Sequence, residues 1–191
     1  ERLGADIEQV RRGIGSDSRI GYDFLYPGCG FGGSCLPKDL RALIHTAKRV
    51  EYDAPILRAV ESVNQRQKGV LFEKLNHALN GQLEGKVIAV WGLAFKANTN
   101  DMREAPSRQL LEALWTAGAR VQAYDPAAMR EAERMYETRG DLHLCATREE
   151  AVMGADALVI CTEWSEFRAV DFRWLQSKLG QPIVVDGRNL F

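Results

Sequence analysis

Hydrophobic and polar residues follow two different periods along the chain, and the period changes near Gly81. In the first part, apolar residues recur every three or four positions, which predicts amphipathic helices. We expect a first helix that ends near Asp17, a second that begins after Pro37, and a long third helix from Pro55 to Leu79. Pro37 suits a first helical turn, because the N–H that proline lacks would be unpaired there.

After Gly81, short apolar segments alternate with helical patterns. The segments KVIAVWG, RVQAYDP, DALVICT and PIVVDG predict strands, and residues 106–117 and 127–138 predict helices between them. Continuous apolar strands separated by helices are typical of a parallel sheet covered on both faces. We therefore predict an α/β protein: a helical central dimerisation segment, residues 1–82, followed by a Rossmann-like doubly wound parallel-sheet domain, residues 83–191.

The loop between the first two predicted helices, GYDFLYPGCGFGGS, contains five glycines and leads directly to Cys35. A thiol at a helix N-terminus faces unpaired N–H groups and the positive end of the helix dipole, and Lys38 adds a charge, so we expect a lowered pKa and a nucleophile. Asp39 lies one helical turn further and could orient water or help to move a proton. The alternative is a small buried cysteine beside a capped helix.

Composition excludes several classes of partner. Lys and Arg number 25 against 26 Asp and Glu, so no one-sided field would recruit nucleic acid or a membrane. No apolar run approaches the roughly 20 residues that cross a bilayer, and the first residues are charged, so we expect a cytoplasmic protein. The four cysteines are too few for a disulfide framework, and the spacing of Cys29 and Cys35 does not indicate a metal site. The chain begins within a helical pattern and ends after a strand, which indicates a piece of a longer protein.

Three blocks, residues 18–43, 91–107 and 184–191, resemble the UDP-glucose and GDP-mannose dehydrogenase family. In that family the matching cysteine attacks the C6 aldehyde of the sugar, and a second oxidation gives a thioester that water hydrolyses, with two NAD reduced per sugar. The resemblance thus implies that Cys35 is the catalytic nucleophile and that Asp39 assists water or proton transfer.

The resemblance also implies binding residues. For NAD these are Cys35, Lys38 and Arg103, and Arg19 is expected to reach the substrate of a neighbouring subunit. The residues implied for the sugar nucleotide are Arg19, Phe24, Leu25, Tyr26, Pro27, Gly28, Gly32, Phe95, Lys96 and Arg188.

One expected motif is missing. The first strand of the second domain ends in WGLAFK, which lacks the second and third glycines of G-x-G-x-x-G, so this domain should not bind NAD in the usual manner. The resemblance implies instead that it binds the nucleotide of the sugar and that NAD is held mainly by a domain upstream. Asp125 is then interpreted as part of a structural turn, with Pro126 starting a helix.

Two classes of function remain open. One is an enzyme that converts UDP-glucose to UDP-glucuronate, or alternatively acts on GDP-mannose, because the resemblance implies that Ser34 and Lys38 are compatible with both substrates. The other is a non-catalytic module for nucleotide binding and dimerisation. In either case we expect a homodimer or higher homo-oligomer formed through the helix at 55–79.

Overall fold

The computed structural model describes residues 1–191, in which five strands alternate with helices. The helices are α1 Ile7–Gly15, α2 Leu36–Arg49, α3 Pro55–Ala78, α4 Pro106–Thr116, α5 Met129–Tyr136, α6 Arg148–Val152 and α7 Phe172–Lys178, with a 3-10 helix, η1, at Ser165–Arg168. The strands are β1 Val87–Trp91, β2 Arg120–Tyr124, β3 Leu142–Leu144, β4 Ala157–Ile160 and β5 Val184–Asp186.

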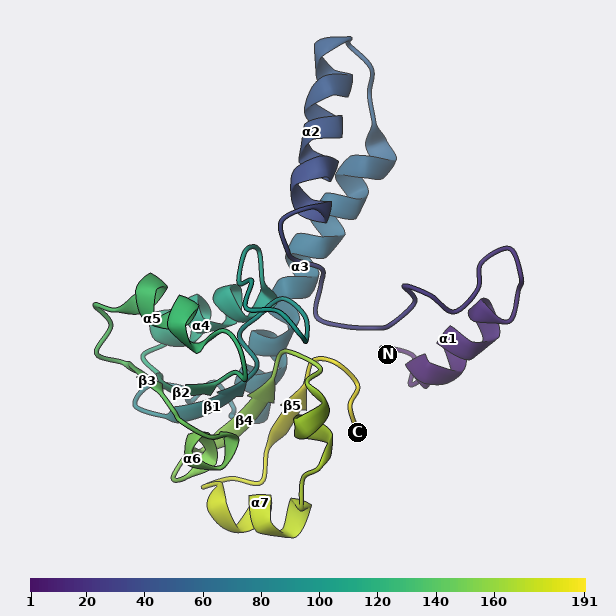
Figure 1. The fold of residues 1–191 in the computed structure, drawn as a ribbon. Helices are drawn as coiled ribbons and strands as arrows, with labels where there is room; N and C mark the ends of the chain where they lie inside the picture. The colour runs from purple at the N-terminus through teal and green to yellow at the C-terminus, as the bar shows by residue number, and fades with distance from the viewer.

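The five strands form one parallel sheet in the order β3-β2-β1-β4-β5. The chain moves outward from β1 to β3 and then returns to the other side of β1, so the sheet is doubly wound, as predicted (Figure 1). The loops at the carboxyl ends of the strands therefore meet along one edge, which is where ligands bind in sheets of this kind.

Alternate side chains of β1 supply the two halves of the core. Ile88 and Val90 pack with residues of α3, α4 and α5 on one face, whereas Ala89 and Trp91 pack with α6, η1 and α7 on the other. Trp91 stacks on Phe167 of η1 at a centroid distance of 5.2 Å. The burial of both faces explains why the strands are apolar throughout.

Helix α3 joins the two parts of the molecule. Its first half pairs with α2 as an antiparallel hairpin that rises from the sheet, and its second half lies on the sheet (Figure 1). Leu71 and Leu75 of this second half are buried in the core of the sheet domain. In contrast, Ile56, Val60 and Val63 in the first half are exposed.

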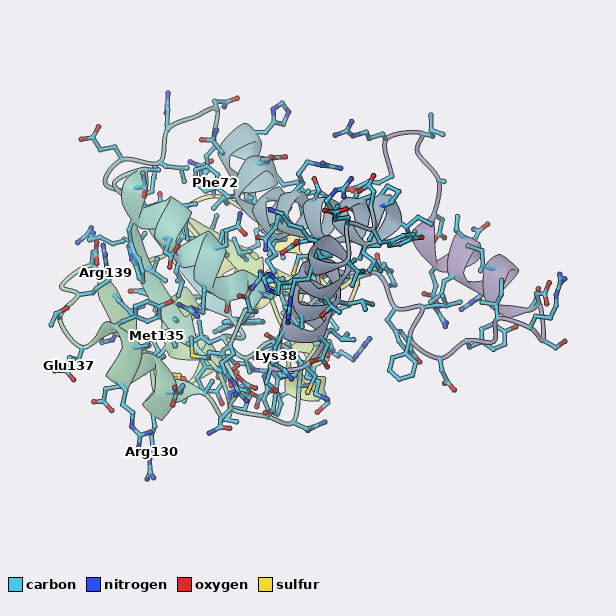
Figure 2. All side chains as sticks on the ribbon, turned by 90° about the horizontal axis from the view of Figure 1, so that it is seen from above. Lys38, Phe72, Arg130, Met135, Glu137 and Arg139 are labelled. Carbon is cyan, nitrogen blue, oxygen red and sulfur yellow. The ribbon has the colours of Figure 1, made fainter.

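Helix α1 is set apart from the sheet. Asp6 caps its N-terminus by accepting hydrogen bonds from the amides of Glu8 and Gln9. In the view from above (Figure 2), α1 lies on the opposite side of α2 and α3 from α5, where Arg130 and Met135 are labelled. No helix of the structure is long and apolar enough to cross a membrane.

The differences from the predicted elements concern short helices, helix ends and the three-residue edge strand β3, which was not among the four predicted strands. Helices α6 and α7, of five and seven residues, were not predicted, since neither is long enough for a helical period to be recognised. The first helix ends at Gly15 rather than near Asp17, and α5 begins at Met129. Pro126 therefore lies in the turn before α5 and does not start the helix.

Replacing Leu75 by alanine should lower the free energy of unfolding by about 2–5 kcal/mol, because its side chain is fully buried where α3 meets the sheet. Urea unfolding followed by circular dichroism measures this loss. The control is Glu73→Ala, an exposed position on the same helix, which should change the free energy by no more than about 0.5 kcal/mol. Equal effects of the two substitutions would contradict the placement of α3 in the core.

Candidate active site

The glycine-rich loop has two parts with different surroundings, and its first part lies beside α1. The guanidinium of Arg11 is 5.9 Å from the ring centroid of Tyr22 and 5.0 Å from that of Tyr26. Phe24 has a positive φ of 61° and its side chain is 99% exposed. Residues 22–26 thus do not contribute to the surface formed by the sheet edge in this chain.

The second part of the loop crosses the carboxyl edge of the sheet at very close range. The amide of Gly33 donates to the carbonyl of Arg103 at 2.7 Å. A Cβ at Gly33 would lie 2.8 Å from the ring of Phe95, and one at Gly32 would collide with the carbonyl oxygen of Glu104. Side chains at these two positions would push the loop away from the sheet, so glycine is required.

Cys35 follows this contact and occupies the N-cap position of α2, where it is exposed. The carbonyl of Cys35 accepts from the amide of Asp39 at 2.9 Å, which closes the first turn. The amides of Leu36 and Lys38 donate no hydrogen bond within the chain. An exposed thiol is therefore held beside two open N–H groups, a setting that stabilises an anion.

The two charged neighbours of Cys35 on α2 pair with each other. Lys38 Nζ lies 2.8 Å from Asp39 Oδ1, and this hydrogen bond raises the pKa of Lys38. Both side chains are mostly exposed, so either can rotate toward a ligand at the start of the helix.

The other three cysteines, Cys29, Cys145 and Cys161, are buried. Burial raises the pKa of Cys29 and of Cys161, and it raises that of Cys145 to about 11. Cys29 belongs to the glycine-rich loop but its side chain is buried, with its sulfur 3.9 Å from the carbonyl oxygen of Cys161. Cys35 is thus the one accessible thiol.

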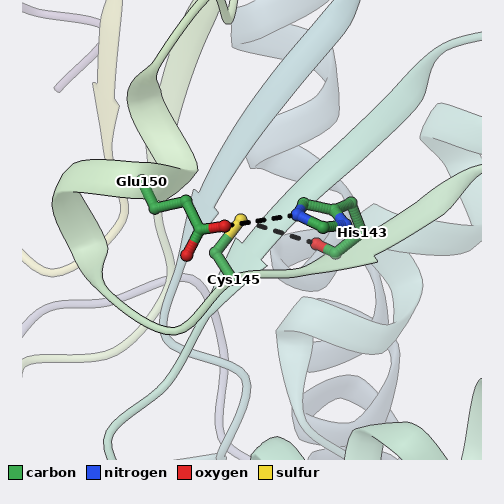
Figure 3. Close-up of side chains that lie close together, drawn as sticks. All are labelled: His143, Cys145 and Glu150. Carbon is green, nitrogen blue, oxygen red and sulfur yellow. Dashed lines mark hydrogen bonds and ion pairs between the residues drawn. The ribbon is translucent and has the colours of Figure 1, made fainter.

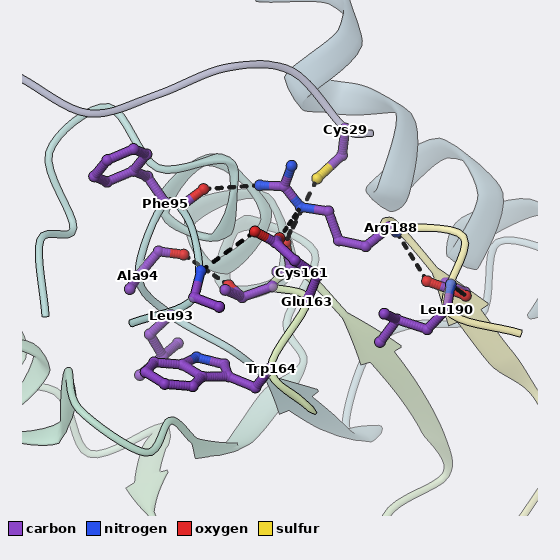
Figure 4. A network of polar contacts seen from close by, with 12 residues as sticks. Cys29, Leu93, Ala94, Phe95, Cys161, Glu163, Trp164, Arg188 and Leu190 are labelled. Carbon is purple, nitrogen blue, oxygen red and sulfur yellow. Dashed lines mark hydrogen bonds and ion pairs between the residues drawn. The ribbon is translucent and has the colours of Figure 1, made fainter. Parts of the chain in front are cut away.

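Arg188, in the turn after β5, is fixed largely by the protein itself (Figure 4). Its Nε donates to the carbonyl of Cys161 and its Nη2 to that of Phe95, both at 2.8 Å, and Nε lies 3.2 Å from Glu163 Oε2. Its Nη1 makes no hydrogen bond within the chain and lies against Gly28, where a Cβ would be 2.8 Å away. One amino group of the guanidinium is consequently left to contact a ligand.

Phe95, Lys96 and Arg103 lie in the long turn between β1 and α4. Lys96 is exposed, and its Nζ is 5.4 Å from the ring centroid of Phe95. Arg103 forms a bidentate pair with Asp101, which raises the pKa of Arg103, and the nearby Cys35 adds to this shift. The structure thus brings Gly32 and Gly33 against Phe95 and Arg103, and Gly28 against Arg188. Of these side chains, Arg103 interacts electrostatically with Cys35.

Arg19 is not part of this group. Its guanidinium pairs with both carboxylate oxygens of Asp17, at 3.0 and 2.6 Å, and its side chain is 86% exposed. Contact with the substrate of a neighbouring subunit stays a prediction for this residue. Leu25 and Pro27 are half-buried in the loop between Arg19 and Gly28.

A cavity of about 860 Å³ lies beside Gly28 in the glycine-rich loop rather than at Cys35. Its lining includes Pro27, Gly28, Gln67 and Asn189 but none of Cys35, Phe95 and Lys96. Since the thiol and the exposed lysine lie outside it, the cavity does not define the site of chemistry.

The turn after β1 is closed by the internal carboxylate of Asp125, the residue interpreted from the sequence as part of a structural turn; its hydrogen-bond donors were not predicted. Asp125 is completely buried and accepts five hydrogen bonds of 2.7–3.2 Å. The donors are the amides of Leu93, Ala94, Ala127 and Ala128 and the indole of Trp164. The amides at the end of β1, which would bind the pyrophosphate of a dinucleotide, are already occupied.

One cluster has the side chains of a metal site. The donor atoms of His143, Cys145 and Glu150 lie within 4.8 Å of one another at the edge strand β3 (Figure 3). Glu150 already accepts from the amide of Ala146 at 2.7 Å and lies 3.5 Å from His143 Nε2, while Thr147 caps its amide. The three side chains are therefore held together by contacts that form the N-terminus of α6, and no metal ion is needed to explain their proximity.

The doubly wound sheet and the glycine loop on its carboxyl edge define a nucleotide-binding α/β protein. Residues 1–66 match the central domain of the UDP-glucose/GDP-mannose dehydrogenase family, and residues 89–191 match the UDP binding domain of that family. The chain belongs to the UDP-glucose/GDP-mannose dehydrogenase family.

Individual relatives agree with this assignment. The UDP-glucose 6-dehydrogenase of Pseudomonas aeruginosa is 53% identical over 98% of this chain, and that of Rhizobium meliloti is 46% identical over 100%. The structure of a UDP-glucose dehydrogenase from Pyrobaculum islandicum is 34% identical over 100% of the chain, with a TM-score of 0.90. The chain spans 42%, 43% and 42% of the length of these three proteins, respectively.

Iodoacetamide should modify Cys35 alone in the folded chain, because the three other thiols are buried. Peptide mapping by mass spectrometry identifies the modified residue, and the same reaction in denaturant should modify all four cysteines. The variant Cys35→Ser serves as the control and should not react when folded. Rapid modification of Cys29 or Cys161 in the folded chain would show that the loop is not seated as described.

Replacing Asp125 by alanine should lower the free energy of unfolding by more than about 3 kcal/mol, because five donors, three of them in fully buried hydrogen bonds, lose their acceptor. The control is Asp141→Ala, which removes an exposed pair with Arg139 and should cost about 1 kcal/mol or less. Urea unfolding compares the two variants. A cost for Asp125→Ala no larger than that of the control would refute the assigned role of the carboxylate.

Proposed function

We propose that this chain is part of an NAD-dependent UDP-glucose 6-dehydrogenase in which Cys35 is the nucleophile. The observation that carries the proposal is the position of an exposed thiol at the start of α2, directly after a glycine loop that lies on the nucleotide-binding domain. The names and coverage of the relatives support the same activity.

In the proposed reaction, the 6-hydroxyl of the sugar is first oxidised to an aldehyde. The Cys35 thiolate then forms a bond to C6, and the resulting thiohemiacetal loses a hydride to become a thioester. Water cleaves the thioester, which releases the carboxylate and regenerates the thiol. The open amides of Leu36 and Lys38 stabilise the thiolate, and Asp39 orients water or carries a proton.

NAD would accept the two hydrides, and among the residues of this chain Cys35, Lys38 and Arg103 would face it. The occupied turn after β1 does not fit the pyrophosphate of NAD. We therefore assign the main NAD site to the part of the relatives that this chain does not span.

The sugar nucleotide would lie along the glycine loop between Phe95 and Arg188. Lys96 is an exposed cation beside the Phe95 ring, which suits a phosphate next to a stacked base or ribose. Gly28 and Gly32 let the loop backbone approach the ligand, and residues 24–27 would close over it. GDP-mannose is the alternative substrate, because Ser34 and Lys38 fit either sugar.

A homodimer or higher homo-oligomer would cover the exposed apolar positions of α3. Ile56, Val60 and Val63 lie four and three residues apart, so they form one stripe along the helix. In such an assembly Arg19, which extends beside α1, would contact the substrate of the other subunit.

In the full-length protein, Cys35→Ser should reduce formation of UDP-glucuronate by on the order of 10³-fold or more, because serine cannot form the thioester. Coupled absorbance of NADH together with chromatography of the acid measures this loss. UDP-glucose and GDP-mannose are assayed side by side, and Asp141→Asn serves as a control with normal turnover. Normal acid formation by the serine variant would contradict the mechanism. Turnover of GDP-mannose but not of UDP-glucose would support the alternative substrate.

A further inference from the structure

One face of α3 holds the backbone of the glycine loop with polar side chains. Asn64 Oδ1 accepts from the amide of Phe31 at 2.8 Å, and its Nδ2 donates to the carbonyl of the same residue at 3.1 Å. Gln67 Nε2 donates to the carbonyl of Gly28 at 2.9 Å. These contacts fix the loop from Gly28 to Phe31, a few residues before the thiol.

Lys68, on the next position of this face, is a buried cation. The residue is only 3% exposed, and its Nζ donates to Glu104 Oε2 at 2.9 Å. A Cβ at Gly30 would lie 3.0 Å from the Lys68 side chain, so the loop passes directly over it. A buried ammonium depends strongly on its single carboxylate partner.

Glu104 also forms an ion pair with Arg41 of α2. Arg41 Nη1 donates to Glu104 Oε1 at 2.8 Å, and Arg41 Nε donates to Glu61 Oε1 of α3 at 2.7 Å. Arg41 and Lys68 hold the pKa of Glu104 at about 2, so its carboxylate is charged at all physiological pH values. Glu104 itself has a φ of 54°, an unfavourable conformation for a residue other than glycine, and its carbonyl faces Gly32.

Three segments that surround Cys35 therefore meet at one carboxylate. Helix α2, which has Cys35 as its N-cap, is bound through Arg41. Helix α3, which holds the loop, is bound through Lys68. The turn that carries Glu104 is joined to the loop by the carbonyl of Arg103, which accepts a hydrogen bond from the amide of Gly33.

We propose that Glu104 and Lys68 are positioning residues that set the geometry of Cys35. The catalytic purpose of this positioning rests on the proposed function. The positioning itself does not, because the reactivity of the Cys35 thiol can be measured without turnover. A buried ion pair adds little net stability compared with apolar packing, but its hydrogen bonds are directional and demand one arrangement of the helices. The pair thus fixes where α2 begins relative to the loop.

The test compares Glu104→Gln with the double variant Glu104→Gln/Lys68→Met. The single variant keeps the shape of the side chain and leaves the Lys68 charge buried without a partner, so both Tm and Cys35 reactivity should fall. The rate constant for alkylation of Cys35 by iodoacetamide at neutral pH should decrease about threefold to fivefold as the helix start moves away from the thiol. Asp141→Asn is the matched loss of an exposed carboxylate pair and should leave the rate constant unchanged.

The double variant separates positioning from folding. Because the buried Lys68 charge is removed together with its partly exposed partner, Tm should recover toward the wild-type value, whereas the alkylation rate constant should stay low. Recovery of both quantities together, or a single variant within twofold of wild type, would overturn the proposal.

The full-length protein gives a second readout. There Glu104→Gln should reduce kcat with UDP-glucose on the order of 10- to 100-fold while KM changes by less than about threefold, as expected for a displaced reacting group. An increase in KM at unchanged kcat would contradict positioning. If the wild-type protein forms no acid, the proposed function fails, whereas the alkylation result still decides the role of Glu104.

Discussion

The close approach of the glycine loop to the carboxyl edge of the sheet is the constraint on which the site depends. Gly32 and Gly33 leave no room for a side chain, and Gly28 leaves little beside Arg188. One hydrogen bond, from Gly33 to Arg103, joins the two backbones at this point. Because Cys35, the N-cap of α2, follows two residues after Gly33, the loop contact determines where its thiol lies relative to the nucleotide-binding domain.

The Asp125 carboxylate shows how a doubly wound sheet can serve a different ligand at the same edge. In a dinucleotide-binding turn, the amides after the first strand are left free for an external phosphate. Here the Asp125 carboxylate accepts hydrogen bonds from the amides of Leu93 and Ala94, which rigidifies the turn and closes it to an external phosphate. Within the proposed function, ligand contacts therefore fall to residues further along the loop, such as Phe95 and Lys96.

The sequence predicts those parts of the structure that depend on local pattern. Apolar segments flanked by helices were sufficient for the doubly wound sheet, and Pro37 after a glycine loop placed Cys35 at a helix start. The Lys68–Glu104 pair joins residues 36 positions apart, and nothing in the local sequence of either residue indicates the partner. The five donors of Asp125 likewise come from three separate loops, so its role depends on the folded arrangement.

The contacts of Arg188 indicate that Arg188 and Lys96 have different roles in the proposed site. A guanidinium that binds phosphate in the bidentate manner needs two free N–H groups on one edge. In Arg188 the Nε and Nη2 groups are engaged by Cys161 and Phe95, and Glu163 balances the charge, so Nη1 is the group that remains next to Gly28. Lys96 has neither an ion pair nor a buried stem and can move with a ligand. Within the proposed function, Arg188 therefore fixes the orientation of the loops and contributes one contact, whereas Lys96 supplies the mobile charge for the phosphate.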